Sequence, residues 1–467
     1  MATVDKHVHP DGPTVRTLAS RTPRPLISHR HMFRLFCLIT AILGASVPLA
    51  AQSRPAPPPA NTARLAGEWI FEMEGDGQPQ RVTLTSSGDS LRGQVYGQNF
   101  AASLTGTRLT FAVGDFRWRA TVRGDSLVGF LGVAPDSSRW FGVRDARPPV
   151  PRSVRLEPTT WWRGISATAT PALRIAAGDT VRTTTVDAGG WGRGAYGDRA
   201  NKLTMGGNPL TGPFYVEGAL PGDVLIIKLH RVRLNRGWAF SGTWLMDNAI
   251  DGSYAAERKG TPPDAPQNNQ WLLDTLGGIA RLDKPPTALA NFTVPLTPFL
   301  GVIAAAPGTE FTPSSRESGA YGGNMENRYI REGATVMLPV RTRGAYLYLG
   351  DGHAAQGDGE LTGDAMETSL DVTFSVEIKR WGFNDIIRLE DDEQIMSVGV
   401  GGSLDEAMRR ATSDMARWLE REYKLTSTEA ALVMGFALRF DIPDVVPPGF
   451  GVTARFPKSA LSQLSRR

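Results

Sequence analysis

Cysteine and histidine are almost missing from this chain of 467 residues. The one cysteine, Cys37, lies in an apolar run near the N-terminus, and removal of that run would leave no thiol. A chain without thiols excludes a cysteine nucleophile, thiolate metal ligands and disulfide bonds. Of the six histidines, only His230 and His353 lie beyond residue 51, so any histidine chemistry must use one of these two.

The main part of the chain also lacks an excess of charge of either sign. Six of the 51 basic residues but only two of the 47 acidic residues lie within residues 1–51, which leaves 45 of each beyond that segment. The sequence pI of about 9.2 therefore comes from the N-terminus. This balance argues against nucleic acid or an anionic membrane surface as a partner.

The N-terminal segment has the features of an export signal. A basic residue precedes an apolar run from Leu35 to Ala51, and small residues end the run. The run has 17 residues and contains Ser46 and Pro48, whereas a membrane-spanning helix needs about 20 apolar residues. We therefore expect residues 1–51 to be a cleaved signal peptide and the mature protein to be secreted or periplasmic, without a membrane partner. An uncleaved anchor and a true start at Met32 are the alternatives.

Glycine and proline are abundant, and they indicate many turns and a β-rich protein. The chain has 51 glycines and 33 prolines, and its length predicts two or three domains. A proline-rich linker over residues 52–64 is followed, over residues 65–147, by short alternating runs separated by glycine–aspartate turns. Hairpins at this spacing predict a small antiparallel β-barrel or sandwich.

The tetrapeptide GDSL occurs twice in this region, at Gly88–Leu91 and Gly124–Leu127. A family of serine esterases is known by these letters, but Gly-Asp-Ser between two strands is ordinary turn sequence. The region also contains no histidine that could pair with either serine. We expect turns here. Covalent labelling of Ser90 or Ser126 by a phosphonate would favour the esterase alternative.

Two helices are expected near the C-terminus. Ser403 is followed three residues later by Glu406, and Thr426 is followed by Glu429 at the same spacing. Both pairs match the capping-box pattern that begins a helix. Apolar residues then repeat at helical spacing. These helices are expected to cover a sheet and to have no catalytic role.

Four glycine-rich polar blocks lie beside apolar runs in the larger part of the chain. They are GNPLTGPFYVEGALPGD (207–223), PLTPFLGVIAAAP (295–307), GGNMENRYIREGATVMLPV (322–340) and GAYLYLGDGHAAQGDGELTGDAMET (344–368). In their sequence and their order these blocks resemble the acetamidase/formamidase family, which hydrolyses small amides to a carboxylate and ammonia. The resemblance covers residues 156–460. It implies a mainly β (α+β) fold, a β-sandwich-like amidase unit with C-terminal helices, and a homo-oligomeric enzyme that uses metal in at least some members.

The stretch GDGHAAQGDGE, Gly350–Glu360, combines one histidine with several carboxylates on a glycine-rich turn. Amide hydrolysis needs an activated water, a group that polarises the carbonyl and an acid for the leaving nitrogen. Without a usable cysteine, a divalent metal is the simplest source of the first two. Imidazole with carboxylates suits zinc, whereas a set of oxygen ligands suits calcium.

These requirements give nine residues candidate roles. The expected metal ligands are His353, Asp351 and Asp187. The expected catalytic carboxylates are Glu360, Asp358 and Glu217, and the general base is Glu360 or Asp358. The residues expected to bind the substrate are Asn208, Asn324 and Gln356.

Each assignment has a structural alternative. Gly-Asp-Gly is a common turn sequence, a single histidine in such a loop often only holds the loop by hydrogen bonds, and asparagine after glycine is a routine turn choice. Glu326 stands where the resemblance leads us to expect aspartate, and the export signal and the added N-terminal β-domain are further departures. These departures bear on which amide the protein accepts more than on the type of reaction. The leading hypothesis is a secreted amidohydrolase that cleaves a small linear amide such as formamide or acetamide; a non-catalytic protein that binds a small ligand is the alternative.

Overall fold

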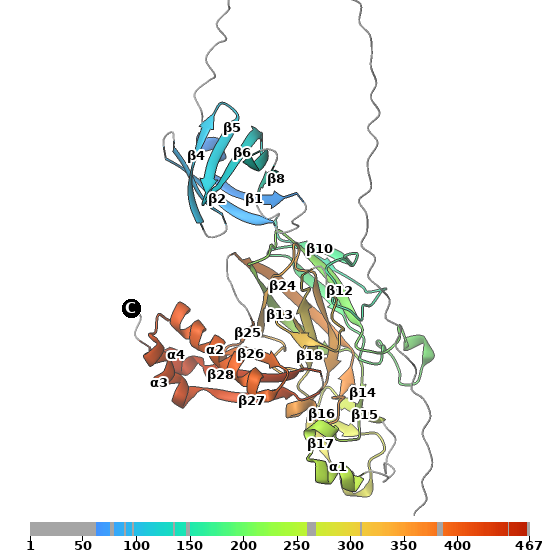
Figure 1. The fold of residues 1–467 in the computed structure, drawn as a ribbon. Helices are drawn as coiled ribbons and strands as arrows, with labels where there is room; N and C mark the ends of the chain where they lie inside the picture. The colour runs from blue at the N-terminus through green and yellow to red at the C-terminus, as the bar shows by residue number, and fades with distance from the viewer. Residues whose placement is uncertain are drawn as a thin grey trace, which may run out of the picture. The chain divides into compact units, whose positions relative to one another are not determined.

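The computed structural model describes residues 62–464, except residues 75–78, 88–89, 96–97, 134–135, 146–149, 259–267, 309–310, 381–385 and 447. The expected signal peptide and nearly all of the proline-rich linker lie outside the described residues. Within the described part, no helix is long and apolar enough to cross a membrane. Strands dominate the fold, as Figure 1 shows.

Eight antiparallel strands close into a barrel, in which β1 pairs with both β2 and β8. The strands are β1 (Gly67–Met73), β2 (Gln80–Ser87), β3 (Ser90–Val95), β4 (Gln98–Thr105), β5 (Arg108–Val113), β6 (Phe116–Arg123), β7 (Ser126–Val133) and β8 (Asp136–Arg144). Buried and exposed residues alternate along β4 and β6, because successive side chains of a strand point to opposite faces. A closed barrel is one of the two architectures that the sequence predicted for this region.

The barrel interior is filled by aromatic side chains. Trp69, Phe71, Phe111, Trp118 and Trp140 are all buried, and the rings of Phe111 and Trp118 stack with centroids 5.3 Å apart. Large rings of this kind contribute most of the apolar area that stabilises a small core. The interior therefore forms a packed core.

The serines of the two GDSL copies each begin the second strand of a hairpin. Ser126 begins β7, and its Oγ donates a hydrogen bond to the carbonyl of Arg123 at 2.8 Å. Ser90 begins β3 and bonds the carbonyl of Ser87 in the same way at 3.2 Å. These contacts are turn contacts, and they support the structural interpretation of both copies.

Residues 153–464, which we call the sandwich unit, contain two large sheets. The first sheet has eleven strands: β10 (Leu173–Ala176), β12 (Leu210–Glu217), β14 (Trp238–Gly242), β15 (Asn268–Asp274), β16 (Ile279–Leu282), β17 (Thr293–Pro295), β18 (Phe299–Ala305), β19 (Ser318–Gly319), β20 (Gly322–Asn324), β22 (Leu347–His353) and β23 (Glu367–Thr368). The second has nine: β9 (Ser153–Arg155), β11 (Thr180–Thr184), β13 (Val224–Leu234), β21 (Thr335–Pro339), β24 (Leu370–Lys379), β25 (Ile387–Glu390), β26 (Gln394–Gly401), β27 (Arg439–Asp444) and β28 (Phe450–Pro457).

The two sheets share one hydrophobic core. Phe214, Leu300 and Leu349 of the first sheet belong to the same buried cluster as Leu225 and Phe374 of the second. The rings of Phe214 and Phe374 meet edge to face with centroids 5.2 Å apart. Strands buried on both faces read as continuous apolar runs, as β18 does, and all seven residues of β18 are buried. All seven residues of β22 are buried too, although two of them are an aspartate and a histidine. The predicted mainly β fold with a sandwich-like unit is confirmed.

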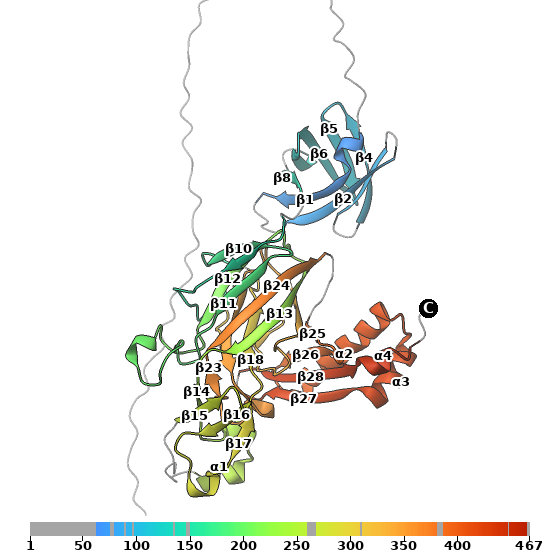
Figure 2. The ribbon, with the colours of Figure 1, turned by 180° about the vertical axis from the view of Figure 1, so that it is seen from behind.

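Helices are few, and the longer ones lie near the C-terminus (Figure 2). They are α1 (Gly252–Arg258), α2 (Leu404–Glu422), α3 (Ser427–Ala437) and α4 (Lys458–Leu461). Trp418 of α2 and Ala430 of α3 pack with Phe456 of β28, so these helices cover the second sheet, as the sequence predicted. The capping box at Thr426 and Glu429 is complete. Ser403 caps α2, but Glu406 accepts its hydrogen bond from the backbone of Gly402, so this box is displaced by one residue.

Candidate functional site

The end of β22 carries two of the predicted site residues into the interior. Asp351 and His353 are exposed by 2% and 0%. In the strand register, His353 lies directly opposite Glu367 of β23 and opposite Phe299 of β18. The ring of Phe299 meets the imidazole edge to face at 4.9 Å, which closes one side of the site with an apolar wall.

Carboxylates surround the imidazole of His353 on several sides. Its Nε2 lies 3.1 Å from Oε1 of Glu367 and 3.7 Å from Oδ1 of Asp351, and its Nδ1 lies 3.3 Å from Oε2 of Glu326. Glu360, in the short 3-10 helix η5 (Asp358–Glu360), completes the group. Ligand atoms of Glu326, Asp351 and His353 lie within 4.8 Å of one another, and so do those of His353, Glu360 and Glu367.

Gln356 determines how the imidazole is oriented. Its Nε2 donates hydrogen bonds to the backbone carbonyls of Glu326 and Pro443, both at 3.0 Å, so its Oε1 faces Nδ1 of His353 at 2.9 Å. An amide oxygen accepts, and Nδ1 is therefore the protonated nitrogen. The lone pair of Nε2 then points toward the carboxylates of Asp351 and Glu367, which is the tautomer that a metal ligand requires.

Four buried atoms of this cluster have no hydrogen-bond partner among the described residues. They are Oε2 of Glu326, Oδ1 of Asp351, Nε2 of His353 and Oε2 of Glu367. Buried polar atoms in proteins are nearly always paired, and leaving them unpaired costs free energy. When the carboxylates are ionised and Nε2 is unprotonated, all four are acceptors, and a cation would satisfy them together. The residues present therefore fit a divalent metal ion.

The pKa values of the cluster support the same conclusion. Burial and the neighbouring carboxylate of Asp351 raise the pKa of Glu367 to about 8. Burial also holds the pKa values of Glu326 and Glu360 well above their usual range. Burial by itself lowers the pKa of His353, but the charges of Glu367 and Glu326 outweigh it and raise that pKa. Like charges this close oppose one another, and a cation between them would relieve the repulsion.

Backbone strain is concentrated at the site. Asn208, Glu326, Asp351 and Glu360 have positive φ angles of 51°, 49°, 54° and 46°, and only three other non-glycine residues of the described chain do. Residues other than glycine rarely adopt positive φ angles, and such strain is typical of functional sites. Space is also limited, because a Cβ at Gly301 would lie 2.6 Å from Oε2 of Glu326. The surrounding fold therefore holds these carboxylates in place.

The two predicted asparagines lie beside the cluster and hold Asp351. The Nδ2 group of Asn208 donates to Oδ2 of Asp351 at 2.6 Å and to Oδ1 of Asn324 at 3.0 Å. Both hydrogens of that amide are thus used inside the protein. In the structure, Asn208 orients Asp351 and Gln356 orients His353. Binding of a substrate by Asn208, Asn324 or Gln356 stays a prediction.

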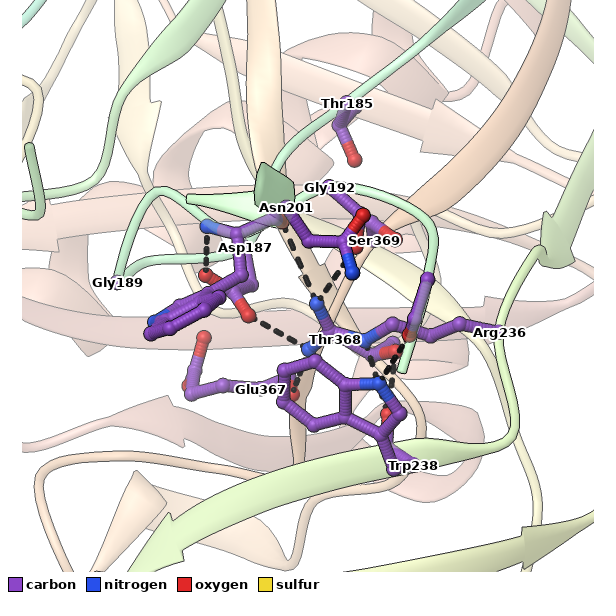
Figure 3. A network of polar contacts seen from close by, with 12 residues as sticks. Thr185, Asp187, Gly189, Gly192, Asn201, Arg236, Trp238, Glu367, Thr368 and Ser369 are labelled. Carbon is purple, nitrogen blue, oxygen red and sulfur yellow. Dashed lines mark hydrogen bonds and ion pairs between the residues drawn. The ribbon is translucent and has the colours of Figure 1, made fainter. Parts of the chain in front are cut away.

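Asp187, a predicted metal ligand, is not brought into the cluster. It is fully buried, but its Oδ2 accepts from Nη2 of Arg236 at 2.5 Å and its Oδ1 accepts from the backbone of Trp191 at 2.9 Å. Figure 3 shows Arg236 between Asp187 and Glu367, whose backbone carbonyl accepts a second bond from Nη2 at 3.1 Å. The carboxylate of Asp187 is therefore neutralised by Arg236, and through Arg236 it positions the strand that carries Glu367.

Two predicted catalytic carboxylates also lie elsewhere. Asp358 is about half exposed and pairs with Arg328 at 2.9 Å. Glu217 is exposed and pairs with Arg174 at 2.6 Å. It lies seven residues beyond Leu210, the residue of β12 that pairs with Gly350, so it is about 20 Å from the site at roughly 3.3 Å per residue. The expectation that Glu217 lies near the site is corrected, and of the predicted bases only Glu360 reaches the cluster.

Sequence reasoning missed Glu367 and Asp364 as site residues. Both lie in the block that also contains His353, but their position depends on strand pairing, because β23 returns beside β22. Asp364 is largely buried, and burial together with Asp351 raises its pKa to about 6. The density of acids in GELTGDAMET was the available signal. Glu326 was noted only as a departure from an expected aspartate, and the structure places it at the centre.

Comparison with known proteins gives an independent view of the chain. A model of the acetamidase/formamidase family matches residues 305–390, which span the strands that carry Asn324, Asp351 and His353. A Schizosaccharomyces pombe protein whose name carries the word formamidase is 26% identical over 220 residues, 38% of this chain and 53% of its own. This chain spans about half the length of the curated relatives it matches.

Solved structures match a larger part of the fold. An acetamidase from Yersinia enterocolitica is 26% identical with a TM-score of 0.58, and the match covers 68% of this chain and 94% of that one. An acetamidase from Bacillus halodurans is 27% identical with a TM-score of 0.54, over 67% and 99% of the two chains. The resemblance that the four sequence blocks indicated is confirmed.

Proposed function

We propose that this chain, which resembles solved acetamidases in fold and matches the acetamidase/formamidase family model over residues 305–390, hydrolyses a linear amide to a carboxylate and ammonia. One observation supports the proposal most: an imidazole, fixed in one tautomer by Gln356, points its Nε2 at buried carboxylates, each of which has one oxygen without a hydrogen-bond partner among the described residues. A site built of acceptors alone fits a divalent cation, and a buried cation next to a pocket is a common arrangement for hydrolysis.

The chain offers a clear set of residues for that cation. His353 through Nε2, with Asp351 and Glu367, would hold it, and Glu326 and Glu360 lie within reach. When bound, a divalent cation would polarise the amide carbonyl and make a water molecule more acidic. One nitrogen with several carboxylate oxygens suits zinc or another transition metal, and calcium is the alternative.

Each surrounding residue then has a defined task. The carboxylate of Glu360 accepts a proton from the attacking water and returns a proton to the amide nitrogen as the C–N bond breaks. The water oxygen remains on the carbonyl carbon, so a carboxylate and ammonia leave. Gln356 holds the imidazole of His353, and Asn208 holds Asp351, so that neither side chain has to reorient during the reaction.

Ammonia release tests the proposal. Purified protein is incubated with formamide, acetamide and propionamide before and after chelation, and then again after Zn²⁺, Ca²⁺ or Mn²⁺ is restored. We expect ammonia from at least one amide, loss of release on chelation and recovery with one of the metals. Bound metal without any turnover of these or larger primary amides would contradict the proposal and favour a non-catalytic binding protein.

Glu360 and Asp358 provide a matched pair of variants, because they are two residues apart in η5 and only Glu360 faces the cluster. Glu360→Gln is expected to lower kcat about 10²- to 10⁴-fold, since a general base typically contributes that much. Asp358→Asn is expected to stay within about twofold of wild type. Equal losses in both variants would point to damage to η5, and the role of Glu360 would then be wrong.

Export and assembly are separate proposals. The apolar run Leu35–Ala51 supports cleavage and a secreted or periplasmic enzyme, which N-terminal sequencing of protein recovered from outside the cytoplasm would test. The resemblance supports a homo-oligomer, which light scattering of the purified protein would measure. Protein that keeps residues 1–51, or that is monomeric at micromolar concentration, would contradict the respective proposal.

A further inference from the structure

A pocket of about 820 Å³ opens beside the buried cluster. Glu360, Gln356 and Ala365 are among its lining residues, so it reaches the proposed base and the residue that holds His353. Acetamide has four heavy atoms and takes the space of about three water molecules, or roughly 90 Å³ at about 30 Å³ each. It would fill only a small part of this pocket. Pockets of roughly 300–1,000 Å³ usually hold considerably larger ligands.

One wall of the pocket is apolar. It is formed by Trp271, Phe292, Val294, Pro295 and Met366. The indole of Trp271 is held in place because its Nε1 donates to Oγ of Ser241 at 2.9 Å, and the ring of Phe292 meets it edge to face at 6.4 Å. Phe292 is 49% exposed, although burial of such a ring is favourable. Its free face is therefore available to an apolar group of a ligand.

The lining of the pocket also includes arginines that already have partners. Arg328 pairs with Asp358, Arg331 with Asp391 and Arg455 with Asp441. Guanidinium groups neutralised in this way give little selection for an anionic ligand. The aromatic wall is therefore the feature that distinguishes one substrate from another.

We infer that the site selects primary amides whose acyl group carries an aromatic ring or an apolar group of similar size, bound by Trp271 and Phe292. The inference rests on the proposed amidase function. Because the proposed products are a carboxylate and ammonia, the nitrogen is unsubstituted and only the acyl side of the substrate can extend into the pocket.

A second pocket of about 460 Å³ provides the competing site for the acyl group. It reaches Asn208 and Asp364 and contains Tyr196 and Trp238, but it also contains the cations Lys202 and Arg316. Tyr196 is 56% exposed and takes no part in the cluster. A variant at Tyr196 is therefore a matched aromatic control for a variant at Phe292, since both remove a half-exposed ring from a pocket wall.

The test compares kcat/KM for acetamide, phenylacetamide and 3-phenylpropionamide in the metal-loaded wild type and in Phe292→Ala, Trp271→Ala and Tyr196→Ala. For the wild type we expect at least a tenfold preference for a phenyl-bearing amide over acetamide, because one or two methylene groups alone change selectivity about tenfold or more. Phe292→Ala is expected to reduce that preference at least fivefold, through a lower kcat/KM for the phenyl-bearing amides. Tyr196→Ala should leave the preference unchanged.

The outcomes separate this inference from the proposed function. Hydrolysis of acetamide without any preference for the phenyl-bearing amides would overturn the inference and leave the amidase proposal standing. A preference that Tyr196→Ala abolishes and Phe292→Ala does not would assign the acyl group to the second pocket and also overturn it. No hydrolysis of any amide would contradict the amidase proposal itself. Phe292 is half exposed, so its variant remains informative if Trp271→Ala fails to fold.

Discussion

Two groups of buried charged residues in the sandwich unit differ in how completely their polar atoms are paired. On the buried face of α2, Asp414 accepts two bonds from Arg388, at 2.8 and 2.9 Å, and a third from Ser397 at 2.8 Å. Around His353, by contrast, several carboxylates meet with no guanidinium among them, and four polar atoms lack partners among the described residues. The first group is complete within the chain and stabilises the fold. The second is incomplete within the described chain, and its residues fit a cation.

The largest effect that sharpens this contrast is expected from Asp351→Asn. The change keeps the shape of the side chain but removes one acceptor of the cluster. We expect kcat/KM for the preferred amide to fall at least 10³-fold, about 4 kcal/mol of transition-state stabilisation. Stability measured after chelation should stay equal or rise, because repulsion among the carboxylates decreases. A destabilised but active variant would show that Asp351 is a structural residue.

Asp414→Asn should have the opposite effect. Removal of the charge leaves the guanidinium of Arg388, whose side chain is 11% exposed, without its partner. Breaking a buried pair typically costs about 3–5 kcal/mol, so chemical denaturation should show a loss of that order. Activity per folded molecule is expected to be unchanged. Loss of activity without loss of stability would contradict the distinction between the structural pair at Asp414 and the cluster around His353.

The double variant Arg388→Met with Asp414→Leu is the control for this interpretation. Replacing both members of a buried pair by apolar residues is often nearly neutral, so the double variant should recover most of the lost stability. If it stays as unstable as the single variant, packing beneath α2 explains the loss and the ion pair does not.

Addition of a divalent cation should have a smaller effect that depends on the cluster. A ligand that binds only the folded state at 100 times its Kd stabilises it by about 2.7 kcal/mol. We expect the wild type and Asp414→Asn to gain this stability by thermal unfolding in Zn²⁺ or another matching cation, and Asp351→Asn to gain little. An equal gain in all three proteins would place the cation elsewhere.

The smallest effect is expected from Glu217→Gln. Its partner Arg174 is mostly exposed, and surface ion pairs contribute about 0–1 kcal/mol. Stability and kcat/KM should both remain within experimental error of the wild type. A large loss of activity would restore the earlier prediction that Glu217 is catalytic.

Local patterns were read correctly from the sequence because neighbouring residues determine them. The turn at Ser126, the cap at Thr426 and the alternating strands of the barrel all depend on a few adjacent positions. The proximity of Asp351 and His353 follows in the same way, because they are two residues apart at the end of one strand. For these features the composition of a short segment was sufficient.

Features that depend on strand pairing could not be read in this way. Glu367 faces His353 because β23 pairs with β22, and Asp187 faces Arg236, 49 residues further along the chain. Both Asp187 and Glu217 lie near strand ends in glycine-rich sequence, so their composition resembled that of a site residue. Only the structure showed that Asp187 meets Arg236 and that Glu217 lies at the far end of β12.

Gln356 makes the geometry of the site depend on how far folding has progressed. Its amide connects a histidine of the first sheet with carbonyls 30 and 87 residues away, the second of them in β27 of the other sheet. The imidazole is therefore locked only when the last hairpin of the chain has docked. In the proposed enzyme, acquisition of metal would therefore be tied to completion of the native state, and a truncated or partly assembled chain would be a poor competitor for scarce ions.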